Sequence, residues 1–117
     1  MTELNAFGAI LTFAIEMEGE IAAYYQGIGS PRAADAEKRR SNLERVRREN
    51  VTEIKLEPID GLNAADYKLN LADTSPEGQK AVEAIAARFY ADTAPKLNVR
   101  EAQRALERAG KQHAELA

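Results

Sequence analysis

The sequence predicts an all-α fold, a four-helix bundle made of two helical hairpins that a long crossover connection joins. Three observations lead to this prediction. Apolar residues recur at alternating spacings of three and four, prolines and glycines divide the chain at intervals typical of helices, and the stretch 57–74 shows no sustained helical pattern. A chain of 117 residues can bury one hydrophobic core but not two, so 1–117 is expected to form a single domain.

The first hairpin is expected to consist of helices 2–28 and 31–56. The first helix is amphipathic and ends at two glycines, of which Gly29 is the second. Its periodic stripe comprises Leu4, Phe7, Leu11, Ala14, Glu18, Ile21, Tyr25 and Ile28. For the second helix, Ser30 is the expected cap and Pro31 the first helical residue, where the missing N–H of proline costs nothing.

The connection 57–74 and the helix 76–94 follow. The connection contains one expected helical turn at Ala64–Tyr67, and its length suits a chain that returns to the other end of a bundle. Thr74 or Ser75 is expected to cap the third helix, because a proline follows at its first turn.

The fourth helix is expected at 98–116. Asn98 and Glu101 have the spacing of a capping box at its start. A second stripe with alternating spacings of three and four runs along it through Val99, Ala102, Leu106, Ala109, His113 and Leu116.

The composition narrows the classes of function. The chain has no cysteine, which excludes disulfides, thiolate metal sites and cysteine nucleophiles. Its longest apolar run, 6–15, is about half as long as a membrane span requires, so a soluble, cytoplasmic protein without membrane embedding is expected. The net charge is −3, acids interleave with the bases of 32–50, and aromatics are 6%, so no nucleic-acid partner is expected.

Two glutamates occupy stripe positions that call for apolar residues. Glu18 begins the segment EGEIAAYY and Glu83 begins EAIAARFY, and each glutamate precedes a tyrosine, Tyr25 or Tyr90, by seven residues. The segments LERVRREN at 43–50 and LERAGKQH at 106–113 repeat in the same order. A buried carboxylate needs a cation, a metal ion or a proton, so both glutamates are candidate site residues unless they reach water at the edge of the stripe.

These residues resemble the ferritin-like superfamily, in particular rubrerythrin-type domains. In that family the first and third helices each contribute a Glu ahead of a Tyr, the second and fourth each contribute Glu-x-x-His, and the six side chains hold two irons. The resemblance implies that Glu18, Glu83 and His113 match the ligand set. The repeat alignment places Arg47 and Asn50, with Gly110, where the other ligands would stand, so the di-iron set is degenerate.

An ion network is the expected replacement for the metals. A guanidinium from Arg47 between Glu18 and Glu83 would balance both carboxylates through its fixed donors, with Tyr25, Tyr90 and Asn50 as neighbours of these groups. A surface position for Arg47 within the basic run is the alternative.

Two functions follow from these expectations. One is a structural or partner-binding module that has lost its di-iron centre, has no catalytic residue and no cofactor, and forms a homodimer or binds another protein. The other is a metal-binding oxidoreductase or iron-handling protein, with iron or manganese held by Glu18, Glu83 and His113. A plain helical bundle whose likeness to ferritin-like proteins is accidental is a third possibility.

Overall fold

The computed structural model describes residues 4, 6–50, 59 and 61–117. It contains the α-helices α1 (Phe7–Gly27), α2 (Arg32–Asn50), α3 (Pro76–Thr93) and α4 (Arg100–Leu116), and the short 3-10 helices η1 (Ala64–Tyr67) and η2 (Ala94–Lys96). No strand occurs in the described part of the chain, which confirms the predicted all-α class. Within the same residues, no helix combines the length and the apolar character that crossing a membrane would require.

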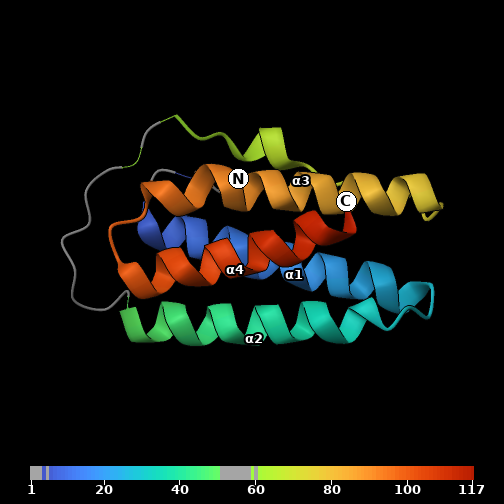
Figure 1. Cartoon of the computed structure of the whole chain (residues 1–117), viewed down its shortest axis with the longest axis horizontal. Helices are drawn as coiled ribbons and strands as arrows, with labels where there is room; N and C mark the ends of the chain where they lie inside the picture. The colour runs from blue at the N-terminus through green and yellow to red at the C-terminus, as the bar shows by residue number, and fades with distance from the viewer. Residues whose placement is uncertain (1–3, 5, 51–58, 60) are drawn as a thin grey trace.

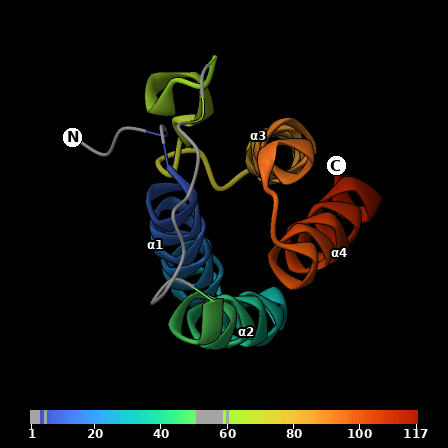
Figure 2. The ribbon, with the colours of Figure 1, turned by 90° about the vertical axis from the view of Figure 1, so that its left-hand side faces the viewer.

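The four helices form two hairpins, α1 with α2 and α3 with α4 (Figure 1). The chain leaves α2 at one end of the bundle and enters α3 at the other, so α2 and α3 run in the same direction (Figure 1). Seen along the bundle, α2 and α4 lie side by side, while η1 lies over the space between α1 and α3 (Figure 2). The predicted bundle of two hairpins joined by a long crossover is therefore confirmed.

The ends of the helices agree with the predictions in part. α1 begins at Phe7, after Ala6 in the extended conformation, so the predicted start of this helix near residue 2 is wrong, and it ends one residue before the predicted limit. The predicted stretch of α2 from 51 to 56 lies outside the described residues. Ser75 caps α3 as predicted, because its hydroxyl accepts a hydrogen bond from the amide of Gly78 at 3.1 Å. Ser30 accepts from the amide of Arg32 at 3.2 Å, and α2 begins at Arg32, one residue after the proline.

The predicted capping box of the fourth helix is wrong. α4 begins at Arg100, and Val99 precedes it without a side-chain cap. The carboxylate of Glu101 instead accepts a hydrogen bond from the amide group of Asn50 in α2, at 2.8 Å. A contact between helices thus uses the side chain that the local pattern assigned to a cap.

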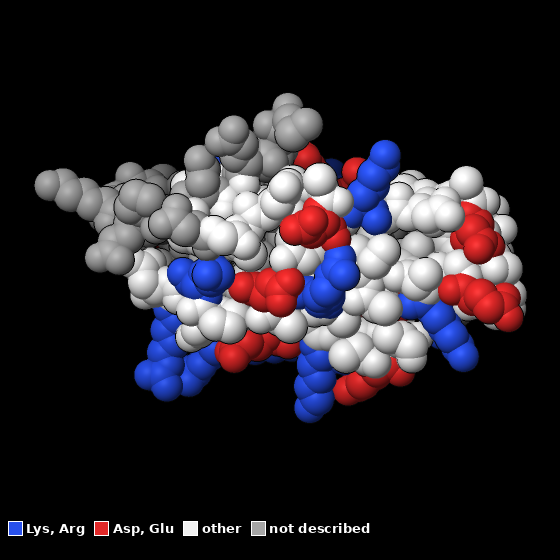
Figure 3. All heavy atoms as spheres, turned by 90° about the horizontal axis from the view of Figure 1, so that it is seen from above, with Lys and Arg blue, Asp and Glu red and all other residues white. Residues whose placement is uncertain are grey.

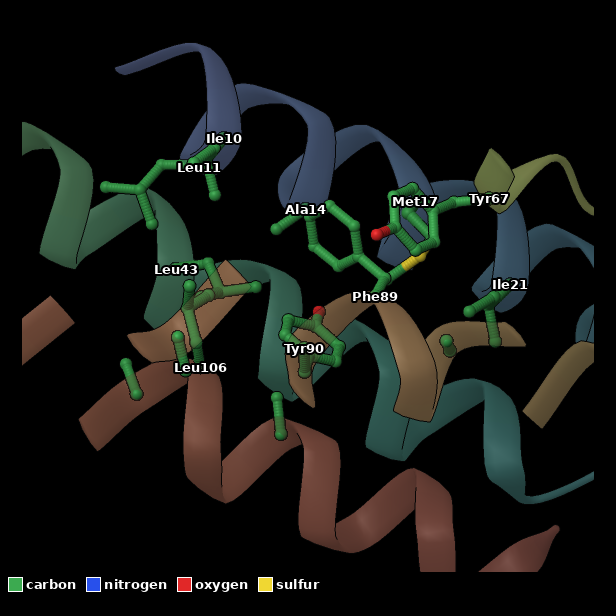
Figure 4. Close-up of a cluster of buried hydrophobic side chains, with 14 of the residues drawn as sticks. Ile10, Leu11, Ala14, Met17, Ile21, Leu43, Tyr67, Phe89, Tyr90 and Leu106 are labelled. Carbon is green, nitrogen blue, oxygen red and sulfur yellow. The ribbon is translucent and has the colours of Figure 1, made fainter. Parts of the chain in front are cut away.

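The crossover connection takes part in the core through η1. The ring of Tyr67 lies 5.3 Å from that of Phe89 in α3 and 6.5 Å from that of Phe13 in α1, measured between centroids, and Figure 4 shows Tyr67 beside Phe89 and Met17. Its hydroxyl donates to Asp92 at 2.6 Å. These contacts fill the space between α1 and α3, so the connection does more than link the hairpins.

Within the second hairpin, α3 and α4 approach closely at Gly110. A Cβ atom added there would lie 2.8 Å from Cβ of Tyr90. That distance leaves no room for a methyl group, so the packing of α4 on Tyr90 depends on glycine at this position.

We predict that Gly110→Ala destabilises the protein although alanine favours helices by about 1 kcal/mol over glycine. The added methyl group forces α3 and α4 apart, and such overpacking costs about 1–3 kcal/mol. Gly19→Ala in α1 is the matched control, since its new Cβ would meet the flexible side chain of Arg40 no closer than 3.5 Å. Urea unfolding measures the free energy of unfolding of both variants. A Gly110→Ala variant at least as stable as the unmodified protein would contradict the prediction.

Candidate functional site

Glu18 of α1 and Glu83 of α3 lie in the centre of the bundle. Both side chains are completely buried, and neither reaches water at the edge of the stripe. Each occupies a position of the inward-facing stripe of its helix, so the folding that buries the apolar residues also buries the carboxylates. Two acidic groups are thereby removed from water and need partners inside the protein.

His113 of α4 lies between the two carboxylates. Its Nδ1 is 2.6 Å from Oε2 of Glu83, and its Nε2 is 2.8 Å from Oε2 of Glu18. The ring is completely buried and stacks on that of Tyr90, with centroids 5.7 Å apart and an angle of 11° between the planes. Only the imidazolium form carries a proton on both ring nitrogens and can donate to both carboxylates.

A guanidinium completes the charge balance at Glu18. Nε of Arg39 in α2 is 2.9 Å from Oε1 of Glu18, and Nη1 donates to Oε1 of Gln112 in α4 at 3.1 Å. Arg39 is only 7% exposed, so this ion pair is largely desolvated. Removal of one partner from a buried ion pair of this kind is costly, because the other charge is then left buried and unpaired.

Two tyrosines bind the carboxylates crosswise between the hairpins. Tyr90 of α3 donates to Oε2 of Glu18 at 2.5 Å, and Tyr25 of α1 donates to Oε1 of Glu83 at 2.8 Å. Arg32 in turn donates to the hydroxyl of Tyr25 at 3.4 Å. All four carboxylate oxygens of the two glutamates therefore have a hydrogen-bond donor within the protein.

The environment shifts the pKa values of these groups. Burial alone would raise the pKa of Glu18, but the hydrogen bond and charge of His113, together with the charge of Arg39, hold it below the ordinary 4.5. Burial alone would lower the pKa of His113, yet its hydrogen bonds to Glu18 and Glu83 raise it above the ordinary 6.5. Burial and the neighbouring Glu18 raise the pKa of Tyr90 well above its usual range, so its hydroxyl stays protonated. Glu18 is therefore held as a carboxylate, His113 as an imidazolium and Tyr90 as a neutral phenol.

The prediction that Arg47 balances the carboxylates is wrong. Arg47 is exposed, and its Nε donates to the hydroxyl of Thr12 on α1 at 3.0 Å. The short link between α1 and α2 sets the register of the hairpin, and that register places Arg39 opposite Glu18. Asn50 is also far along α2 from these groups, since its amide donates to the carbonyl of Val46 and to Glu101.

Arg39 is the site residue that sequence reasoning missed. The buried positions of α2 are Ala36, Arg39, Leu43 and Val46, at spacings of three, four and three. The stripe through Leu43 and Val46, continued toward the start of the helix, passes through Arg39. An arginine on an otherwise apolar stripe was the signal that could have found it.

The donor groups do not fit a metal centre as they are arranged. No set of three or more histidine, aspartate or glutamate side chains in the described part of the chain is placed to hold a metal ion. Both nitrogens of His113 already face carboxylate oxygens, which leaves no lone pair directed at a cation. The second helix brings Arg39 to the site, and a guanidinium is a donor of protons and not a metal ligand.

Comparison with protein-family models, curated proteins and solved structures finds no match for this chain. The arrangement of Glu18, Arg39, Glu83 and His113 therefore has to be interpreted from its own geometry. Chemically, it can hold a proton and balance buried charge.

We predict that Arg39→Ala lowers the free energy of unfolding by about 3–5 kcal/mol, because it leaves Glu18 buried without its guanidinium partner. Arg47→Ala is the control, since its exposed side chain bonds only a surface hydroxyl among the described residues and its loss is expected to cost less than about 1 kcal/mol. Urea unfolding at neutral pH measures both. Equal destabilisation by the two substitutions would refute the role given to Arg39.

We also predict that stability depends on pH on both sides of a maximum. The contribution of His113 is fully present below its ordinary pKa of 6.5 and is lost as the pH rises through its higher pKa in the folded protein. The contribution of Glu18 is present above 4.5 and is lost as the pH falls through its lowered folded pKa. The free energy of unfolding should therefore be greatest between about 4.5 and 6.5 as far as these two groups decide it.

The groups that face His113 are Glu18 and Glu83, with Tyr90 stacked on its ring and Arg39 on the far side of Glu18. Replacing His113 with glutamine should remove the decline of stability on the alkaline side. It should also weaken the dependence on the acid side, because the hydrogen bond and charge of His113 are the main influences that hold the pKa of Glu18 down. A titration by NMR that finds the imidazole of the folded protein neutral at pH 6.5 would contradict the prediction.

Proposed function

We propose that the chain is a ferritin-like bundle that has replaced a di-metal centre by a closed ion network and now acts as a structural or partner-binding module. In this proposal Glu18, Glu83 and His113 descend from a ligand set, and Arg39 occupies the place of a second-helix ligand. The module acts through its surface, by contact with a second copy of itself or with another protein.

One observation carries the proposal. His113 donates to Glu18 and Glu83 at 2.8 and 2.6 Å, so the distance between the carboxylates is already spanned by a proton-bearing ring. The single long crossover, with α2 and α3 running in the same direction, supports the resemblance in connectivity, since ferritin-like bundles have one such crossover. The crosswise bonds of Tyr25 and Tyr90 support it as well, because both hairpins contribute equivalent Glu and Tyr residues.

A metal-binding oxidoreductase is the second candidate. The observation in its favour is that Glu18, Glu83 and His113 meet in one buried place, which supplies two oxygen donors and one imidazole. A metal ion there would require His113 to lose a proton and to turn a nitrogen away from its carboxylate. The closed network makes this the less favoured proposal.

Elemental analysis distinguishes the two candidates. The protein is expressed with added iron and manganese and purified without chelator, next to the double variant Glu18→Gln/Glu83→Gln. We predict metal far below one ion per chain in both proteins, because the donors are satisfied within the network. Near-stoichiometric metal in the unmodified protein that is lost from the double variant would refute the proposed module and favour the oxidoreductase.

A further inference from the structure

Two contiguous grooves run between α2 and α4, the neighbouring helices at the lower right of Figure 2. The first has a volume of about 520 Å³ and the second about 400 Å³, and they share Asn42, Ala105 and Arg108. Together they follow most of α4, whose length is about 25 Å at ~1.5 Å per residue. Leu43, Ala105 and Ala109 close the floor but are almost completely buried, and Leu116 is the partly exposed apolar residue at one end of it.

The lining of these grooves is basic, although the whole chain has a net charge of −3. Against three acidic side chains, Asp35, Glu101 and Glu115, it presents six basic ones: Lys38, Arg39, Arg45, Arg100, Arg104 and Arg108. Arg39 is paired with Glu18 and Arg45 with Glu49, so the positive charge that ion pairs leave unbalanced belongs to Lys38 and the three arginines of α4. The face on the side of the crossover connection differs, since basic and acidic side chains alternate over it (Figure 3). The excess of positive charge is thus a property of the α2–α4 grooves.

The fold itself gains little from this charge. Arg100, Arg104 and Arg108 follow one another at intervals of four along α4, where like charges repel. Arg100 is also the first residue of α4, at the end of a helix that disfavours cations. None of the three forms an ion pair with a described residue. Their placement is therefore better explained by an anionic ligand than by stability.

We propose that the α2–α4 grooves dock an acidic, amphipathic helical segment of a partner protein. The acidic face of such a segment would meet the arginines of α4 and would compete with Glu49 for Arg45 of α2. A narrow apolar edge would lie on the partly exposed Leu116. The length of the grooves favours a helix over a small anion. The inference rests on the proposed function, because it names the kind of partner that the module binds.

Other occupants fit these grooves less well. A second copy on a twofold axis would place the same basic lining against itself, which like charges oppose. A nucleic acid would gain the phosphate contacts but would find no aromatic side chain in the lining for its bases, and it would meet Asp35, Glu101 and Glu115. An acidic protein segment with a few basic residues could pair with both the basic and the acidic side chains of the lining.

The test measures binding of a fluorescein-labelled peptide of about 20 residues by fluorescence anisotropy, with glutamates at intervals of four on one face and leucines and alanines on the other. The intact protein is expected to bind it saturably, and more weakly as salt screens the charges. Arg104→Glu is expected to raise Kd at least about tenfold, because it reverses one charge in the lining. Arg45→Glu on the opposite wall should do the same and provides a second variant if the first fails to fold.

Lys80→Glu is the matched control. Lys80 is exposed and is the fifth residue of α3, as Arg104 is of α4, so the two substitutions change the charge by the same amount at the same helix position. Unchanged Kd for Lys80→Glu beside a weakened Arg104→Glu supports the groove.

Three results would overturn the inference: no saturable binding by the intact protein, equal weakening by Arg104→Glu and Lys80→Glu, or tighter binding of a single-stranded oligonucleotide of equal charge that displaces the peptide. Its failure is distinct from that of the proposed function, which metal analysis decides. Stoichiometric metal would refute the proposed module whether or not the peptide binds. Absence of peptide binding by a metal-free protein would refute the docking proposal alone.

Discussion

The burial of Glu18 and Glu83 in the centre of the bundle is the constraint on which the rest of the structure depends. An isolated carboxylate in such a place would be too costly to remain charged, so the surrounding helices must deliver donors at fixed positions. α2 delivers Arg39 and α4 delivers His113, and each contacts a glutamate of the first helix of its own hairpin. Each hairpin therefore pairs its buried glutamate with a basic side chain of its second helix, an arginine in the first hairpin and a histidine in the second.

The same network also joins the two hairpins. Tyr67 of η1 packs between α1 and α3, against Phe13 and Phe89, yet the polar groups of the two helices meet directly. Tyr25 and Tyr90 reach across to the opposite carboxylate, and the two nitrogens of His113 bind one glutamate from each hairpin. Replacement of such a network by apolar residues is often neutral for stability. We therefore attribute to the network the alignment of the two hairpins and not a gain in the free energy of unfolding.

Sequence patterns predicted those features that one helix decides by itself. Periodic stripes located the four helices, Ser75 signalled a cap, and the absence of periodicity located the crossover. The pairing of helices depends on link lengths that a local repeat does not contain. Glu18 and Arg39 are 21 residues apart, whereas Glu83 and His113 are 30 apart. The longer second link accounts for only two of these nine residues, and most of the difference arises because Arg39 is the eighth residue of α2 while His113 is the fourteenth of α4. The match of LERVRREN to LERAGKQH therefore assigned the base of α2 to the wrong residue and placed Asn50 near a site that it does not approach.

Arg39 connects the core with the basic grooves. Its Nε pairs with the buried Glu18, while Nη1 bonds Gln112 in α4 and the side chain lines the larger groove. The guanidinium thus neutralises a buried carboxylate and also forms part of the wall of a surface groove. A lysine would provide a single charged nitrogen for both contacts, whereas the planar fork of arginine serves both at once. The residue that keeps the core balanced is for this reason also part of the surface to which we assign a partner, and the two roles cannot be altered independently.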